Sequence, residues 1–318
     1  MDNRITVCII PAKELDGRKG IKTMINTKQR GLGNLFIFIS AICFSLAGVL
    51  IKMISWSSLS INGIRNILAF GVMLLFLRKK HHKFVVNKVV LLGAGCNLLM
   101  NLTFVMATKL TSAANAIVLQ FIEPIFLILF LWMFWKQKPD RKAVVACLLV
   151  FSGILCFFFD KLSFEGQFGN LLAIFSGALY AFVFLIKKMK NSDFESSILL
   201  SQLASFLIFI PSYVKETDFS PKNLLLILLL GVVQMGLGYV FLSIGLNWVS
   251  PIAASLTSMI EPILNPILVA LFYGEMISPL AFVGAAIVLI SSTGYNILNS
   301  AEEIAECNCG TLQEKAEI

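Results

Sequence analysis

Ten apolar runs, each about as long as a helix that crosses a bilayer, dominate this chain of 318 residues. A spanning helix needs roughly 20 consecutive apolar residues. Soluble domains are about one quarter charged, whereas this chain is 14% charged and 58% hydrophobic. The pattern therefore predicts an all-α integral membrane protein with ten transmembrane helices. We place them, to within a few residues, at 33–54, 60–77, 88–108, 112–135, 142–160, 167–188, 194–214, 222–246, 250–273 and 278–298.

Lysine and arginine are unevenly distributed between the two sets of connections. With the N-terminus in the cytoplasm, the inside connections hold 12 basic residues, whereas the outside connections and helix ends hold 5. Cytoplasmic loops of membrane proteins carry an excess of Lys and Arg. We therefore expect a multi-pass protein of the cell membrane with both termini cytoplasmic. The net charge of +8 then reflects orientation and not a nucleic-acid-binding surface.

Two copies of one unit are visible in the sequence. The tetrapeptide IEPI occurs at 122–125 and again at 260–263, and GNL opens the first and the sixth apolar runs at 33–35 and 169–171. Because each unit has five spans, an odd number, the two copies must have opposite orientations. Inverted repeats of this kind build secondary transporters, with the substrate site near the midplane.

These boundaries divide the chain into four parts. We expect a cytoplasmic tail at 1–32, a first repeat at 33–160, a second repeat at 161–298 and a disordered, acidic cytoplasmic tail at 299–318. Met24 is a candidate for the native start, because the apolar pattern begins only near Leu35.

Glu123 and Glu261 lie midway along the fourth and ninth runs, each followed by a proline. A charge at that depth costs at least ~2.5 kcal/mol, so it usually faces a bundle interior or a water-filled cavity. One interpretation is a carboxylate that lines a cavity and binds an amine or a proton. The other is structural, because Pro124 and Pro262 leave a backbone carbonyl without its donor, and a buried carboxyl can cap such a backbone group.

A second group of polar residues lies in the same central runs. Arg65 is the only arginine within an apolar run; it either snorkels outward or holds an anionic group by a bidentate contact. Amide side chains of this kind also serve as ordinary interhelical hydrogen bonds. The candidates for lining a cavity are Asn101, Gln120, Gln234 and Asn265.

Motifs for catalysis and for cofactor binding are absent from the sequence. We find no nucleotide-binding loop, zinc-protease motif or nucleophile elbow, and no histidine lies in an apolar run. Cys307 and Cys309 alone are a weak metal signal. We therefore expect no enzyme activity, no cofactor and no metal site.

As a set, these motifs resemble the EamA family of the drug/metabolite transporter superfamily. They are Lys52, Ile64-Arg65-Asn66, Ile260-Glu261-Pro262, Gly274-Glu275 and the helix between Gly284 and Gly294. The first repeat departs from this pattern, because Lys136-Gln137 stands where Gly-Glu is expected, so we interpret Glu275 as a structural residue at a helix end. The resemblance implies a membrane carrier, often an exporter of amino acids, metabolites or amphiphilic drugs.

The sequence thus predicts a secondary transporter that exports small organic solutes by alternating access. Its partners are the lipid bilayer, a small-molecule substrate and, as a hypothesis, protons that enter through one of the glutamates. Facilitated diffusion and exchange are alternatives to proton coupling. Two further alternatives are an exchanger of organic phosphates or nucleotide sugars on the same fold, which would need several membrane-embedded cations, and a non-transporting sensor or scaffold.

Overall fold

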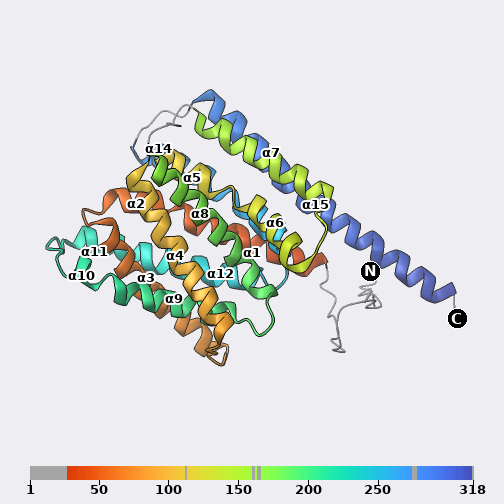
Figure 1. Cartoon of the computed structure of the whole chain (residues 1–318), viewed down its shortest axis with the longest axis horizontal. Coiled ribbons are helices and arrows are strands. Elements are labelled where there is room, and N and C mark those ends of the chain that lie inside the picture. The colour runs from red at the N-terminus through yellow and green to blue at the C-terminus, as the bar shows by residue number, and fades with distance from the viewer. Residues whose placement is uncertain (1–26, 112, 160–161, 163–165, 274–277, 317–318) are drawn as a thin grey trace, which may run out of the picture.

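The computed structural model describes the backbone of the chain except residues 1–26, 112, 160–161, 163–165, 274–277 and 317–318. In that part every regular element is a helix, which confirms the all-α prediction (Figure 1). The elements in chain order are α1 (Thr27–Ser45), α2 (Ala47–Met53), α3 (Ser58–Lys79), α4 (Lys88–Leu110), α5 (Ala113–Gln120), α6 (Glu123–Trp135), α7 (Arg141–Phe158), α8 (Gln167–Leu185), η2 (Ile186–Lys188), α9 (Phe194–Ile208), α10 (Ile210–Tyr213), α11 (Pro221–Leu229), η3 (Leu230–Leu237), α12 (Gly238–Gly245), α13 (Pro251–Ser258), α14 (Glu261–Tyr273) and α15 (Pro279–Ala316).

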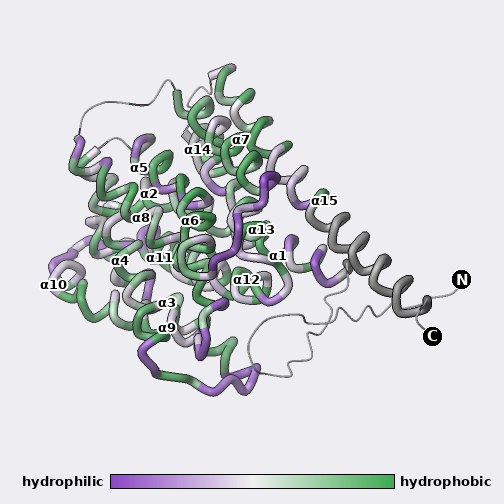
Figure 2. Tube along the Cα trace, turned by 45° about the vertical axis from the view of Figure 1, so that its right-hand side comes forward, coloured by the Kyte–Doolittle hydropathy of each residue, from purple (hydrophilic) through white to green (hydrophobic). Residues whose placement is uncertain are grey.

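Seven helical segments among the described residues are long and apolar enough to cross a membrane. Two shorter apolar helices, Phe194–Ile208 and Pro251–Leu264, accompany them. Every one of the ten runs singled out in the sequence contains helix, while the count of ten crossings stays a prediction. Figure 2 shows green, hydrophobic tubes along the helices and purple, hydrophilic residues mainly in the connections. The seven long spans are Leu59–Lys79, Lys88–Ala107, Asn115–Trp135, Arg141–Phe158, Gln167–Lys188, Pro221–Gly245 and Pro279–Leu298.

Both IEPI segments interrupt their helices in the same way. The helix breaks between α5 and α6 just before Glu123, and between α13 and α14 just before Glu261. Each break carries the same short backbone bond, from the N–H of Ile125 to the carbonyl of Ile122 and from Ile263 to Ile260. A proline one residue after each glutamate has no N–H for the preceding turn, which accounts for both interruptions.

Helix contacts occur in equivalent pairs. Helix α4 packs on α8, and α12 packs on α1. In the first pair the Ser176 hydroxyl donates to the Met100 carbonyl at 2.9 Å. In the second pair the Ser40 hydroxyl donates to the Gly238 carbonyl at 2.8 Å. The two serines are the ones that align when the repeats are superposed in sequence, so matching residues make matching contacts.

The two GNL segments show the same pairing. A Cβ on Gly33 would lie 2.6 Å from Val249, and a Cβ on Gly169 would lie 2.8 Å from the backbone nitrogen of Thr111. Val249 and Thr111 are 138 residues apart, the spacing of the IEPI segments. Only a glycine allows these close approaches, so each GNL glycine seats its helix on the partner repeat.

The connecting segments also pair in a matching way. The segment after α2 meets the one before α11: Ser55 Oγ donates to Asp218 Oδ2, and Trp56 Nε1 donates to the Asp218 carbonyl, both at 2.7 Å. The segment before α9 meets the one before α4, where His82 Nε2 lies 2.6 Å from Asp193 Oδ2. Hydrogen bonding from Ser55 lowers the pKa of Asp218 below its ordinary value. Each end of the bundle is therefore closed by its own set of loop contacts.

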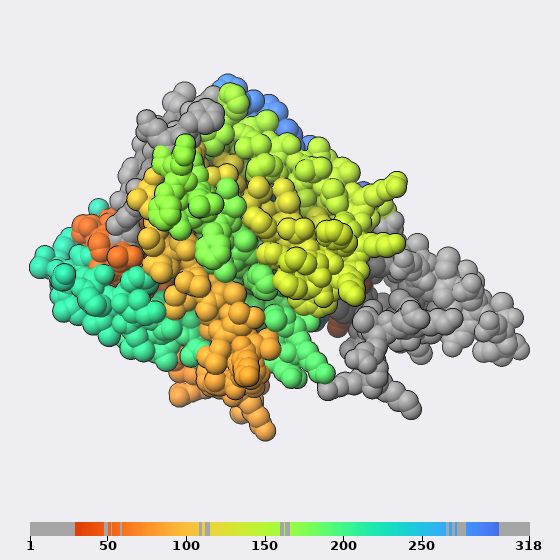
Figure 3. All heavy atoms as spheres, in the orientation of Figure 1, coloured from red at the N-terminus to blue at the C-terminus, as the bar shows by residue number. Residues whose placement is uncertain are grey.

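The apolar core lies where the two repeats meet. Its largest fully buried side chains come from several helices and include Leu127, Ile154, Phe184 and Leu256. Helices α7 and α15 lie side by side along one edge of the bundle (Figure 1). On the face seen in Figure 3, the surface includes α4, α6, α7 and α8, with the teal region of α10 and α11 at the left.

One expectation about the tails needs correction. Helix α15 continues to Ala316 where disorder was expected. Helix α1 begins at Thr27, and the division of the chain into tails and repeats stays a prediction. Residues 301–306 read AEEIAE, a run of mostly good helix formers without proline, so nothing ends the helix at the bilayer surface. Met24 and Glu275 lie outside the described residues.

Candidate functional site

Glu123 opens α6 and is completely buried. Its Oε2 accepts a hydrogen bond of 2.9 Å from the Ser255 hydroxyl on α13. Its Oε1 has no hydrogen-bond partner among the described residues. The break before α6 places the carboxyl group at a helix N-terminus, where the partial positive charge of the helix favours an anion.

Glu261 opens α14 after the equivalent break and is partly exposed. Its Oε2 is buried and has no hydrogen-bond partner in the described part of the chain. The carboxyl groups of Glu261 and Glu123 are close enough to interact electrostatically. The structure therefore brings the two glutamates of the sequence motif into one site.

The environments of the two glutamates differ. At the position of the first repeat that corresponds to Ser255, 138 residues earlier, the chain has Ile117. Isoleucine has no hydroxyl, so Glu261 cannot receive a hydrogen bond equivalent to the one that Ser255 donates to Glu123.

Arg65 on α3 is buried, with 9% of its surface exposed. Its Nε and Nη2 donate to Asn62 Oδ1 at 3.0 and 2.6 Å, and Nη2 reaches Asn101 Oδ1 at 3.4 Å. Asn62 lies one helical turn before Arg65 and orients the guanidinium. No ion pair to Arg65 occurs within the described ranges. A buried guanidinium held only by neutral amides leaves its charge available to an anionic ligand.

A network of amides and hydroxyls continues from Arg65. Asn101 Nδ2 donates to the Asn97 carbonyl at 2.9 Å. Asn97 Oδ1 accepts from the Tyr239 hydroxyl at 2.8 Å, and Asn97 Nδ2 donates to the Ser201 hydroxyl at 2.9 Å. Helices α3, α4, α9 and α12 are tied together by this network, so Arg65 sits on a rigid support.

The remaining candidates differ in their surroundings. Gln120 Nε2 donates to the Ser176 hydroxyl at 2.9 Å, a contact between α5 and α8. Gln234 is buried in η3, a π-helix, and its Oε1 has no partner in the described residues. π-helical segments often mark functional sites. The side chain of Asn265 lies outside the described part of the structure.

Two tyrosines connect the charged groups. Tyr239 lies within electrostatic reach of both Arg65 and Glu261. Tyr180 lies within reach of both glutamates and of Tyr239. Tyr239 is therefore the neighbour that Arg65 and Glu261 share. A small molecule that contacts both sides of Tyr239 would meet a positive group on one side and a negative group on the other.

Three features of this site were not anticipated from the sequence. Ser255, Asn62 and the π-helix were missed, because each acquires its role from a neighbour in space. The spacing of Asn62 from Arg65 was the one available signal, since residues three apart share a helix face. A metal-binding cluster of three or more His, Cys, Asp or Glu does not occur among the described residues.

Comparison with known proteins identifies relatives for the whole region. The sequence profile of the EamA-like transporter family matches twice, at residues 31–159 and 167–297. The uncharacterized transporter YwfM of Bacillus subtilis (strain 168) is 26% identical over 270 residues, which cover 81% of this chain and 91% of that protein. An uncharacterized transporter of Archaeoglobus fulgidus is 24% identical over 260 residues, covering 81% and 93%.

A solved structure has the same fold. It is described only as the crystal structure of a protein, and it superposes with a TM-score of 0.74 at 15% identity. The match covers 85% of this chain and 98% of that one.

Proposed function

The chain belongs to the EamA-like transporter family, and from this premise we propose that it exports small zwitterionic organic solutes across the cell membrane by alternating access. It is a multi-pass membrane protein, and its relatives are named as transporters. The zwitterionic substrate, the direction and the mechanism are the proposed part.

The proposed architecture is ten transmembrane helices in two inverted five-helix repeats, with both termini cytoplasmic. It is supported by the twofold match of the family profile at 31–159 and 167–297. The equivalent hydrogen bonds of Ser40 and Ser176 are a second support. Alternating access follows from such an arrangement, because one repeat can rock against the other around a fixed site.

One observation carries the proposed substrate class. Arg65 is buried without an acidic partner among the described residues, while Glu261 has a buried oxygen without a donor, and Tyr239 lies in reach of both. A carboxylate of the substrate would bind the guanidinium of Arg65. An ammonium group of the same molecule would bind Glu261. Each unpaired protein group thereby obtains the partner that its burial requires.

Proton coupling follows from the same carboxyl group. A protonated Glu261 is neutral and cannot attract an ammonium group, so a proton and the substrate compete for this side chain. Exchange of one for the other across the membrane would couple export of the substrate to entry of a proton. Glu123, whose Oε2 is held by Ser255, would support the site.

The organic-phosphate exchanger is the weaker candidate. It would require several free cations at the centre. Lys187, the other well-buried basic residue of the described spans, already donates to Glu195, to the Ser243 carbonyl and to Asn247 at 2.6–3.0 Å. Arg65 is then the one buried cation of the described site that a phosphate could use.

The test is transport by purified protein in liposomes. Counterflow of a labelled α-amino acid is measured with a panel of unlabelled competitors in which the amino or the carboxyl group is removed. We expect only molecules with both groups to compete. If an analogue with only the amino group or only the carboxyl group competes as strongly as the complete amino acid, the zwitterion proposal is wrong. Absence of flux for the whole panel would favour a sensor or scaffold.

Two glutamine variants test the proton. Glu261→Gln should abolish uptake driven by a pH gradient, and Glu123→Gln should retain its pH dependence with reduced stability. Glu216→Gln, which changes a carboxyl group outside the site, is the matched control. If Glu123→Gln and Glu261→Gln both transport with unchanged pH dependence, the proton role is wrong.

A further inference from the structure

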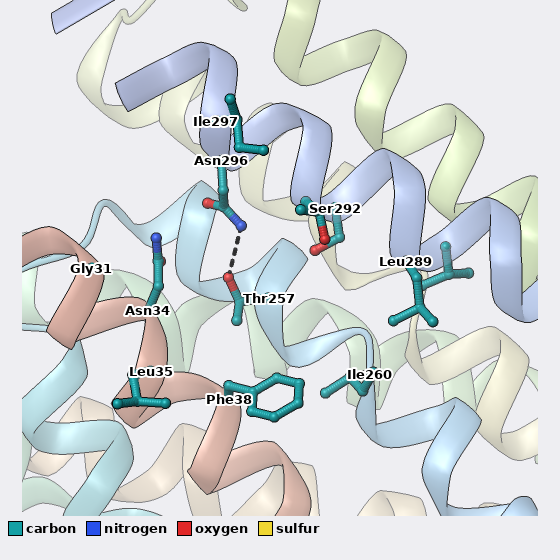
Figure 4. A pocket seen from close by; sticks show the side chains of 12 residues that line it. Gly31, Asn34, Leu35, Phe38, Thr257, Ile260, Leu289, Ser292, Asn296 and Ile297 are labelled. Carbon is teal, nitrogen blue, oxygen red and sulfur yellow. Dashed lines mark hydrogen bonds between the residues drawn. The ribbon is translucent and has the colours of Figure 1, made fainter. Parts of the chain in front are cut away.

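A second hollow, separate from the charged centre, lies between α1, α13 and α15 (Figure 4). Its volume is about 620 Å³, within the ~300–1,000 Å³ typical of sites for small organic molecules. None of the 12 residues that line it carries a charge. Ile260 lines the hollow and directly precedes Glu261. The hollow therefore reaches the break between α13 and α14, but the carboxyl group of Glu261 does not line it.

The mouth of the hollow is apolar and faces outward. Leu35 is 50% exposed, Phe38 is 40% exposed and Leu289 is 42% exposed. Leu289 belongs to Pro279–Leu298, one of the seven candidate membrane spans. Exposed leucine and phenylalanine on such a span contact hydrocarbon, because the bilayer surrounds them. A ligand would therefore enter this hollow from the lipid phase.

The wall of the hollow is polar and neutral. Asn296 Nδ2 donates to the Thr257 hydroxyl at 3.0 Å, as Figure 4 shows. The Ser292 hydroxyl donates to the Leu256 carbonyl at 2.7 Å. Asn34 also lines the hollow, but its Oδ1 is buried and is not presented to it. The hydroxyl oxygens of Thr257 and Ser292 each have two lone pairs, so the Ser292 hydroxyl can still accept a hydrogen bond from a ligand.

We propose that this hollow binds a membrane amphiphile with one hydrocarbon chain and an uncharged, hydrogen-bonding head. The chain lies between Leu35, Phe38 and Leu289, and a hydroxyl of the head donates to the Ser292 hydroxyl. A charged head would lose its hydration without gaining a counter-charge from the lining. A pure hydrocarbon would bring no hydrogen-bonding group to the polar wall. The lining thus selects for a neutral head and a single chain.

The test is photolabelling of the full chain in phosphatidylcholine nanodiscs. The probe is a monododecanoylglycerol with a diazirine on its acyl chain, and labelled peptides are mapped by mass spectrometry. We expect labelling on 27–45 and 279–298, suppressed by excess monododecanoylglycerol. Dodecylphosphocholine, which has a charged head, and dodecane, which has none, should compete less.

Two substitutions on one helix locate the site. Leu289→Trp fills the mouth, whereas Ile290→Trp adds the same bulk at a neighbouring position that is 72% exposed and outside the lining. We expect labelling to fall to background in Leu289→Trp only. Ser292→Ala should weaken competition by monododecanoylglycerol about three- to tenfold, the effect of one hydrogen bond, and leave competition by dodecane unchanged.

Several results would overturn the proposal. One is equal labelling of the two tryptophan variants. Another is equal competition by dodecylphosphocholine and monododecanoylglycerol. The third is a Ser292→Ala variant in which monododecanoylglycerol competes as strongly as in the original chain. Because the readout is binding in the membrane, it does not depend on transport, so this inference and the proposed function can fail separately.

Discussion

Replacing Gly177 by alanine should displace α5, the helix that ends just before Glu123. Gly177 of α8 faces the last turn of α5, and a Cβ there would lie 2.5 Å from the Gln120 carbonyl oxygen. Ordinary contact begins at 3.4 Å, so the two helices must separate by about 0.9 Å. A backbone carbonyl cannot rotate away as the end of a side chain does. The hydrogen bond from Gln120 to Ser176, now 2.9 Å, would then approach 3.8 Å and be lost.

The energetic effect can be bounded. Overpacking of this kind costs about 1–3 kcal/mol, and alanine recovers about 0.8–1.0 kcal/mol of helix propensity relative to glycine. Gly95→Ala on α4 is the matched control, because nothing lies within 4 Å of its Cβ. Helix propensity cancels between the two variants, so Gly177→Ala should be less stable than Gly95→Ala by the full overpacking cost.

The assay is equilibrium unfolding in mixed micelles of dodecyl maltoside and dodecyl sulfate, followed by tryptophan fluorescence. Counterflow in liposomes is measured alongside. We expect Gly177→Ala to lose both stability and transport, and Gly95→Ala to keep both. Equal stability of the two variants, with transport intact, would refute the close approach of α8 to the break before Glu123.

Two further pairs of substitutions test other contacts. Gly284→Ala brings a Cβ into close conflict with the Gly153 carbonyl oxygen of α7, whereas Gly294→Ala on the same helix meets nothing within 4 Å. Equilibrium unfolding should show the first variant to be less stable by about 1–3 kcal/mol. Ser255→Ala removes the donor to buried Glu123 and should cost about 1–3 kcal/mol. Ser258→Ala, whose hydroxyl bonds only a carbonyl of its own helix, should be nearly neutral in the same measurement.

The sequence was sufficient to predict the helices because hydrophobic length is a local property. Every run of about 20 apolar residues contains helix, and the two IEPI segments break where proline removes a donor. The C-terminal end of α15 was not predicted, because an acidic tail beyond the last apolar run is typical of disorder. In residues 301–306 the helix propensity of the side chains outweighs the effect of their charge.

The site was predictable only in part. Glu123, Glu261 and Arg65 were identified because a charge in an apolar run is conspicuous. Their partners were not, since Ser255 and Asn62 are ordinary polar residues whose importance depends on which helices meet. The repeat predicted that the two glutamates are equivalent, whereas the structure shows a hydroxyl donor, Ser255, at Glu123 and a buried oxygen without a partner among the described residues at Glu261.

That difference leads to a last prediction about Glu261. If the repeats are related as proposed, position 117 faces Glu261 as Ser255 faces Glu123. Ile117→Thr and Ile117→Val have nearly the same shape and differ by one hydroxyl. A threonine at this position can donate to a carbonyl of its own helix, as Thr257 donates to the Ala253 carbonyl. The two variants should therefore have nearly equal stability, and a hydroxyl that faces Glu261 should act on transport.

The same two variants, Ile117→Thr and Ile117→Val, also test whether the Glu261 carboxyl group binds the substrate during transport. In the Ile117→Thr variant, a hydrogen bond from the threonine hydroxyl to Glu261 would occupy the carboxylate oxygen that we assign to the ammonium group of the substrate. We therefore expect the KM for counterflow to rise in Ile117→Thr and to stay unchanged in Ile117→Val, with equal stability of the two variants. An unchanged KM in Ile117→Thr would show that position 117 does not face Glu261. The argument that assigns substrate binding to Glu261 and support to Glu123 would then lose its structural basis.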